Sequence, residues 1–155
     1  MIPQFKNLSE EEKTALLDAP ALIAVLIAGA DNKIDDKEID YSEKITHFRA
    51  GNTDSALHLY YAEVDKFIHD AIKQQVATLP QDLIERQQII SEELSKLNEV
   101  LPKLDKSFAV ELYKSFISFA KSVAKSSGGL WGYASITPEE ERLLGLEMIK
   151  NPEGI

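Results

Sequence analysis

A short segment in the first quarter of the chain concentrates the side chains most able to do chemistry. Residues 30–38 carry four carboxylates within eight positions, those of Asp31, Asp35, Asp36 and Glu38. Carboxylate oxygens from a short loop are the ligands that Ca²⁺ and Mg²⁺ prefer. This segment, which we call the acidic bend, therefore predicts a divalent-cation site.

The acidic bend does not follow the pattern of an EF-hand loop. Counted from Asp31, Lys33 occupies the third position, Asp36 replaces the glycine of the sixth, and Ser42 stands where the bidentate glutamate belongs. A cation bound here would need a different arrangement of ligands.

A purely structural interpretation of the acidic bend stays open beside the metal interpretation. Asp35 and Glu38 have the spacing of a capping box at a helix start, and Asp36 would then be solvated. Two exposed charges about 4 Å apart repel by only about 1 kcal/mol in water. However, a helix N-terminus offers about half a positive charge, which cannot neutralise four carboxylates.

The apolar periodicity predicts an all-α protein of about seven helices, with no segment that alternates as a strand. Ser9 and Glu12 form a capping box before the first helix, and Pro20 suits the first turn of the second. The second helix is apolar on every side, so we expect it at the centre of the core. The expected ranges are 10–19, 20–28, 35–51, 54–79, 82–101, 107–126 and a last helix that begins near Pro138.

The third expected helix carries an aromatic and aliphatic stripe that includes Tyr41, Ile45 and Phe48. Glu38 lies on the same stripe at helical spacing, which predicts that the stripe and its carboxylate face the core. A buried carboxylate needs a partner, and this favours the metal interpretation.

The helix pairs 20–51 and 107–155 show a similar order of an apolar helix, a glycine-containing link and a capped helix. The segment Ile34 to Glu38 matches Ile136 to Glu140 in the spacing from isoleucine to glutamate. We therefore expect two similar helical hairpins. Only the first link is strongly acidic, because the second carries Lys125 and two serines.

Length, charge and composition limit the function classes. A chain of 155 residues fits one domain, residues 1–155, and can bury enough surface to fold without a metal. The 17 Lys and Arg against 26 Asp and Glu give a net charge of −9, which opposes binding to nucleic acid or anionic membranes and favours divalent cations or a basic protein surface. The absence of Cys excludes thiolate chemistry.

No membrane insertion is expected, because the apolar run 20–30 is too short to cross a bilayer and the start of the chain lacks a signal-peptide pattern. We expect a soluble, cytoplasmic protein.

The sequence contains no recognisable catalytic motif, so we expect a protein that is not an enzyme. His47, His58 and His69 form no His-Glu-x-x-His pattern, and no serine lies in a Gly-x-Ser-x-Gly turn. His58 and His69 are eleven residues apart, about 16 Å along one helix, so they cannot share a metal. We interpret the histidines as surface or boundary residues.

A metal-free interaction module is the alternative to a cation-binding protein. Trp131 and Tyr133 lie in a glycine-containing link and offer either a contact surface for a protein partner or a plug for the core.

The segment Ala30 to Glu38 resembles the Ala-Asp-Gly-x-Ile-x-x-x-Glu signature of the tellurite-resistance TerB-like family, with Asn32 at the usual glycine. The resemblance implies an all-helical, non-enzymatic domain with two similar hairpins, an acidic metal site and a role in stress response. Carried over by position, it implies Asp31 and Glu38 as the central ligand pair and Asp35 as a neighbour. Glu140 is the expected contribution from the second half.

Overall fold

The computed structural model describes residues 2–31, 34–127 and 138–154, without the side chains of Asp31, Ser127 and Glu139. These residues form helices joined by turns and no strand, which confirms the all-α prediction. The α-helices are α1 (Glu10–Ala28), α2 (Asp36–Gly51), α3 (His58–Thr78), α4 (Leu83–Ser95), α5 (Leu97–Val100), α6 (Lys106–Ser127) and α7 (Pro138–Leu144). Short 3₁₀ turns are η1 (Pro3–Phe5), η2 (Gly29–Asp31) and η3 (Leu101–Lys103).

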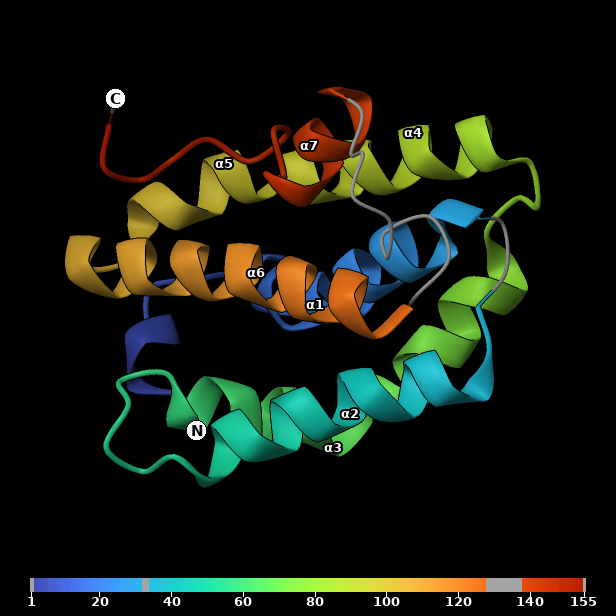
Figure 1. Cartoon of the computed structure of the whole chain (residues 1–155). Coiled ribbons are helices and arrows are strands. Elements are labelled where there is room, and N and C mark those ends of the chain that lie inside the picture. The colour runs from blue at the N-terminus through green and yellow to red at the C-terminus, as the bar shows by residue number, and fades with distance from the viewer. Residues whose placement is uncertain (1, 32–33, 128–137, 155) are drawn as a thin grey trace.

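The helices lie in three tiers around α1 (Figure 1). The middle tier contains α1 and α6, with α4, α5 and α7 on one side and the pair α2 and α3 on the other. Every residue of α1 from Ala19 to Ala28 is buried, as the uninterrupted apolar run predicts. The first α-helix of the chain is therefore the centre of the core.

Pro20 does not separate two helices, so the expected boundary between residues 19 and 20 is wrong. A proline within a helix has no N–H for the carbonyl four residues earlier, which here belongs to Leu16. The buried Tyr60 of α3 replaces that donor, because its hydroxyl donates a hydrogen bond of 2.5 Å to the Leu16 carbonyl oxygen. With this oxygen satisfied, α1 continues through Pro20 to Ala28.

The expected fifth helix, 82–101, is divided at Lys96 into α4 and α5 and ends in η3. Its apolar seam nevertheless faces inward, since Ile90, Leu94 and Leu97 are each 1% exposed or less. The capping side chain of Asp82 accepts a hydrogen bond from the Glu85 amide and fixes the start of α4.

The expected burial of the stripe on α2 is wrong for two of its three residues. Phe48 is 77% exposed and Tyr41 is 37% exposed. Besides Glu38, the buried residues of α2 are Ile39 and the small residues Ser42 and Thr46, and the Thr46 hydroxyl donates a hydrogen bond to Asp65 of α3. Glu38 is buried, as expected, with 7% of its surface exposed.

α2 has its most extensive contacts with α3 rather than with α1, so the tightest hairpin in the first half is α2–α3. The expected likeness of two hairpins, 20–51 and 107–155, stays a prediction. Among the described helices, none combines the length and hydropathy required to span a bilayer.

Candidate metal centre

The acidic bend connects α1 to α2 and is fixed at both ends by hydrogen bonds. At the end of α1, Arg86 of α4 donates a hydrogen bond of 2.6 Å to the Gly29 carbonyl oxygen. A Cβ at Gly29 would lie 3.1 Å from this guanidinium, so glycine leaves room for the contact. A positive charge is favourable at the C-terminus of a helix. The carbonyl that Arg86 contacts belongs to Gly29, two residues before Asp31, the first acid of the acidic bend.

At the start of α2, Asp35 and Glu38 form the predicted capping box. Asp35 Oδ1 accepts from the Glu38 amide at 2.9 Å, and Glu38 Oε1 accepts from the Asp35 amide at 3.0 Å. One oxygen of each carboxylate is thus committed to the backbone. This arrangement agrees with the structural interpretation of the acidic bend.

Of the remaining predicted ligands, the structure describes the side chain of Glu140 but not that of Asp31. Glu140 lies buried in α7, with 8% of its surface exposed. Asp35, Glu38 and Glu140 belong to no described set of three potential ligands within metal-binding distance of one another. Trp131 and Tyr133 also lie outside the described residues.

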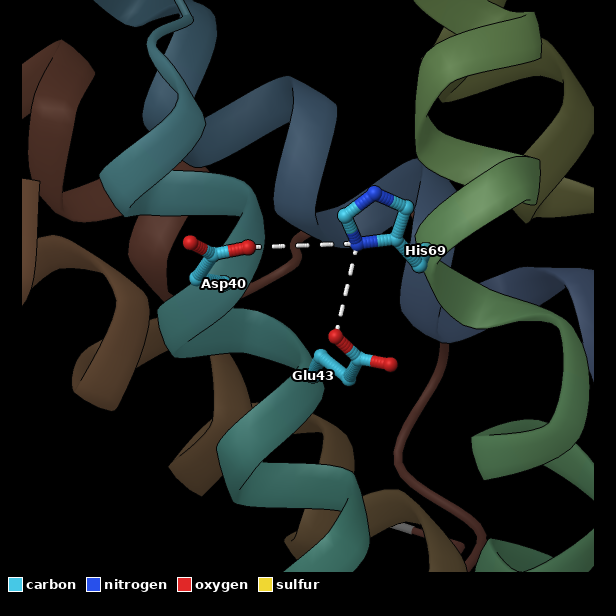
Figure 2. A group of neighbouring side chains, drawn as sticks. All are labelled: Asp40, Glu43 and His69. Atoms are coloured by element: carbon cyan, nitrogen blue, oxygen red, sulfur yellow. Dashed lines mark ion pairs between the residues drawn. The ribbon is translucent and has the colours of Figure 1, made fainter.

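The described residues that do come together are Asp40 and Glu43 of α2 and His69 of α3. One ligand atom from each lies within 4.8 Å of the other two. Figure 2 shows the His69 ring directed toward both carboxylates, with Nδ1 3.9 Å from Asp40 Oδ1 and 3.3 Å from Glu43 Oε1. We call this set the α2–α3 cluster.

Local helix geometry explains the α2–α3 cluster. Asp40 and Glu43 are three residues apart, so they lie on one face of α2 about one turn from each other. His69 follows the buried Ile68, and the packing of this part of α3 places the imidazole at the edge of the α2–α3 contact. Rigid helices therefore hold all three side chains.

The Nδ1 atom of His69 is buried, yet it forms no hydrogen bond within the described part of the chain. The side chains around it are more open to solvent, with exposed fractions of 35% for His69, 44% for Glu43 and 61% for Asp40. Buried polar nitrogens normally have a partner, so a nitrogen that faces two carboxylates without a hydrogen bond favours a bound cation.

One of the separations fits a small first-row metal. Bonds of about 2.0–2.1 Å in a tetrahedral site place neighbouring ligand atoms about 3.3–3.4 Å apart. The 3.3 Å between His69 Nδ1 and Glu43 Oε1 matches this distance. The 3.9 Å between His69 Nδ1 and Asp40 Oδ1 is longer, so the exposed Asp40 carboxylate would have to move closer to bind the same ion. One imidazole with two carboxylates suits Zn²⁺, Mn²⁺, Fe²⁺ or Co²⁺ better than Ca²⁺ or Mg²⁺, which bind oxygen alone.

A second histidine–carboxylate pair lies one helical turn away on the same two helices. His47 Nδ1 is 2.9 Å from Asp65 Oδ2, and Asp65 Oδ1 accepts a hydrogen bond of 3.2 Å from the Thr46 hydroxyl. The hydrogen bond to Asp65, together with the charge of that carboxylate, raises the pKa of His47 above its ordinary value of 6.5. His47 Nδ1 therefore already has a hydrogen-bond partner in the structure, whereas His69 Nδ1 has only the two longer carboxylate contacts.

We expect Asp65→Asn to return the pKa of His47 toward 6.5, measured by NMR titration of the imidazole protons. Because the folded-state pKa is raised, His47 adds stability that is fully present below its unfolded pKa and is lost as the pH rises through the folded pKa. Asp70→Asn, which alters an exposed acid of the same helix, is the matched control. An unchanged titration of His47 in Asp65→Asn would contradict the pairing.

The interpretation of the histidines as surface or boundary residues misses the neighbours of His69. One signal was available, since Glu43 precedes His47 by four residues and Asp65 precedes His69 by four. Two antiparallel helices with this spacing bring each acid to the histidine of the other helix. The signal becomes useful only when the register between the helices is known.

Comparisons of the chain with protein-family models, with curated proteins and with solved structures give no match.

Proposed function

We propose that this protein is a non-enzymatic helical module that binds one divalent transition-metal ion at the α2–α3 cluster, with a structural or regulatory role. The observation that carries the proposal is His69 Nδ1, a buried nitrogen that faces two carboxylates and has no hydrogen bond within the described residues. The ion would join α2 to α3 and would lower the repulsion between Asp40 and Glu43.

The position of the α2–α3 cluster supports a binding role rather than catalysis. All three side chains are 35–61% exposed, so they enclose no space from which a substrate would exclude water. Water molecules would complete the coordination of the ion. A cytoplasmic location and a TerB-like, stress-related role remain parts of the proposal, and the all-helical fold is the one that the TerB-like resemblance implies.

The proposal differs in place and in ion from the site expected at the acidic bend. There, Asp35 and Glu38 each use one oxygen for the capping box. A Ca²⁺ or Mg²⁺ site formed by Asp31, Asp35, Glu38 and Glu140 stays a prediction, and the same experiment can test both sites.

Isothermal titration with Zn²⁺, Mn²⁺, Co²⁺, Mg²⁺ and Ca²⁺ tests the proposal. We expect one transition-metal ion per chain, bound at least about 10-fold more tightly than Mg²⁺ or Ca²⁺. The reason is that Zn²⁺, Mn²⁺ and Co²⁺ favour an imidazole ligand, whereas Mg²⁺ and Ca²⁺ do not. Glu43→Gln keeps the shape of the side chain and removes its charge, and we expect it to weaken binding by at least about 10-fold. Asp36→Asn, at an exposed acid of the same helix, should leave binding unchanged.

Two results would contradict the proposal. Equal heats from the wild-type protein and Glu43→Gln would exclude the α2–α3 cluster. Binding that is lost in Glu38→Gln but kept in Glu43→Gln would place the ion at the acidic bend.

A metal-free interaction module is the second candidate, and exposed apolar side chains favour it. Phe48 of α2, Phe67 of α3 and Ile84 of α4 are 77%, 66% and 75% exposed. With a net charge of −9, a basic protein surface would be the complementary partner. This candidate predicts that none of the five ions produces a binding heat.

A further inference from the structure

A second site is suggested by a cleft between α2 and α6, on a different face of α2 from the α2–α3 cluster. Its volume is about 680 Å³, within the range of about 300–1,000 Å³ typical of small-molecule sites. The α2 wall presents Tyr41, Ile45 and Phe48, and the α6 wall presents Ser115, Ser118 and Ser122. One wall is thus apolar and the other carries hydroxyl groups.

Arg49 lies at the junction of the two walls and joins three helices. Its Nη1 donates hydrogen bonds to the Tyr61 hydroxyl at 2.8 Å and to the Ser115 carbonyl at 2.9 Å, and its Nη2 donates to Ser118 Oγ at 2.7 Å. The guanidinium also lies over the Tyr61 ring, 5.0 Å from its centroid. These contacts hold the positively charged Arg49 guanidinium beside the cleft.

The charge of Arg49 is not balanced by a carboxylate in the described part of the chain. No described Asp or Glu lies within ion-pair distance of it, and its hydrogen-bond partners are neutral oxygens. A half-buried cation normally has an anionic partner. A guanidinium has five N–H donors, and three are used, which leaves two for a ligand.

The other charged residue that lines the cleft is also a cation. Lys44 stands one turn before Phe48 on α2, and no Asp or Glu of the described residues belongs to the lining. The whole chain has a net charge of −9, so a cleft whose described charged residues are both cations differs from the rest of the surface. This local positive charge favours the binding of an anion.

We propose that the α2–α6 cleft binds a small organic anion with an apolar body. The anionic group, a carboxylate, sulfonate or phosphate, binds at Arg49 and Lys44. The apolar body packs against Tyr41, Ile45 and Phe48, and the exposure of the two aromatic rings is otherwise unexplained by the fold. This inference is independent of the metal proposal, since the two sites share no residue.

Fluorescence titration with 8-anilinonaphthalene-1-sulfonate tests the inference, because this dye combines a sulfonate with an aromatic body. We expect saturable binding of one dye per chain. The neutral analogue N-phenyl-1-naphthylamine should bind at least about 10-fold more weakly, since it cannot use the cations. Octanoate and octyl phosphate should displace the dye, and their relative strength shows which anionic group is preferred, whereas octyltrimethylammonium should not displace it.

Variants at exposed positions avoid the structural role of Arg49, whose removal would also break contacts among three helices. Lys44→Glu and Phe48→Ser should each weaken dye binding by at least about 10-fold. Lys73→Glu and Phe67→Ser make the same changes at exposed positions of α3 outside the cleft lining and should have less than about a twofold effect. The inference is overturned if Lys44→Glu and Phe48→Ser bind the dye like the wild type, or if the neutral analogue or octyltrimethylammonium binds as tightly as the anions.

Discussion

Replacing His69 with alanine is expected to reduce the affinity for Zn²⁺ by at least about 100-fold. Mutation of a residue that only hydrogen-bonds to a metal ligand typically lowers metal affinity by about 10–100-fold. His69 would be a ligand itself, and it is the sole nitrogen donor of the α2–α3 cluster. The wild-type protein should gain thermal stability when Zn²⁺ is added, because an ion that binds only the folded state stabilises it by mass action. The variant should gain little. Differential scanning fluorimetry at several Zn²⁺ concentrations measures both effects.

His58→Ala provides the matched control. His58 begins α3, and it lies eleven residues from His69, about 16 Å along the helix. Zn²⁺ should stabilise His58→Ala as much as the wild type. Equal stabilisation of His69→Ala and the wild type would show that the ion binds elsewhere.

Tyr60→Phe is expected to reduce the free energy of unfolding by about 1–3 kcal/mol, the usual cost of leaving a buried polar group without its partner. The hydroxyl of Tyr60 donates a hydrogen bond to the Leu16 carbonyl oxygen. This carbonyl lacks its usual helical donor, because Pro20 has no N–H. The ring itself is retained, and so are its contacts with Phe116 and Tyr61. Urea denaturation of the two proteins measures the difference.

A double-mutant cycle with Pro20→Ala isolates this effect. The substituted alanine would supply the missing N–H to Leu16, so Tyr60→Phe should cost less in the Pro20→Ala background than in the wild type. The same cost in both backgrounds would contradict the proposed replacement of the donor.

Burial also raises the pKa of Tyr60 well above 10. The folded state then retains a proton that the unfolded state loses, so stability declines as the pH rises above about 10. Tyr60→Phe should remove part of this alkaline decline.

Most of the fold could be predicted because it is encoded by local patterns. Residue spacing alone predicts the capping boxes at Ser9 and Asp35, and both form as predicted. The expected last helix is also present, over Pro138–Leu144 of the described residues. The continuation of α1 through Pro20 could not be predicted, because the compensating donor, Tyr60, lies forty residues later in the chain.

The candidate site was harder to predict, because its residues come from two helices. Sequence spacing placed Glu38 on the buried side of α2, and this is confirmed. It also placed Tyr41 and Phe48 there, which is wrong, because both are exposed and the buried residues of α2 besides Glu38 are Ile39, Ser42 and Thr46. Without the register between α2 and α3, nothing in the sequence shows that His69 lies beside Glu43.

Anomalous diffraction from a crystal grown with Co²⁺ or Zn²⁺ tests the central claim most directly, because it locates the ion. The proposal predicts one strong peak within about 2.0–2.3 Å of His69 Nδ1 and of oxygens from Asp40 and Glu43. A peak beside Asp35 and Glu38 with none at His69, or no peak at either place in a crystal saturated with metal, would contradict it.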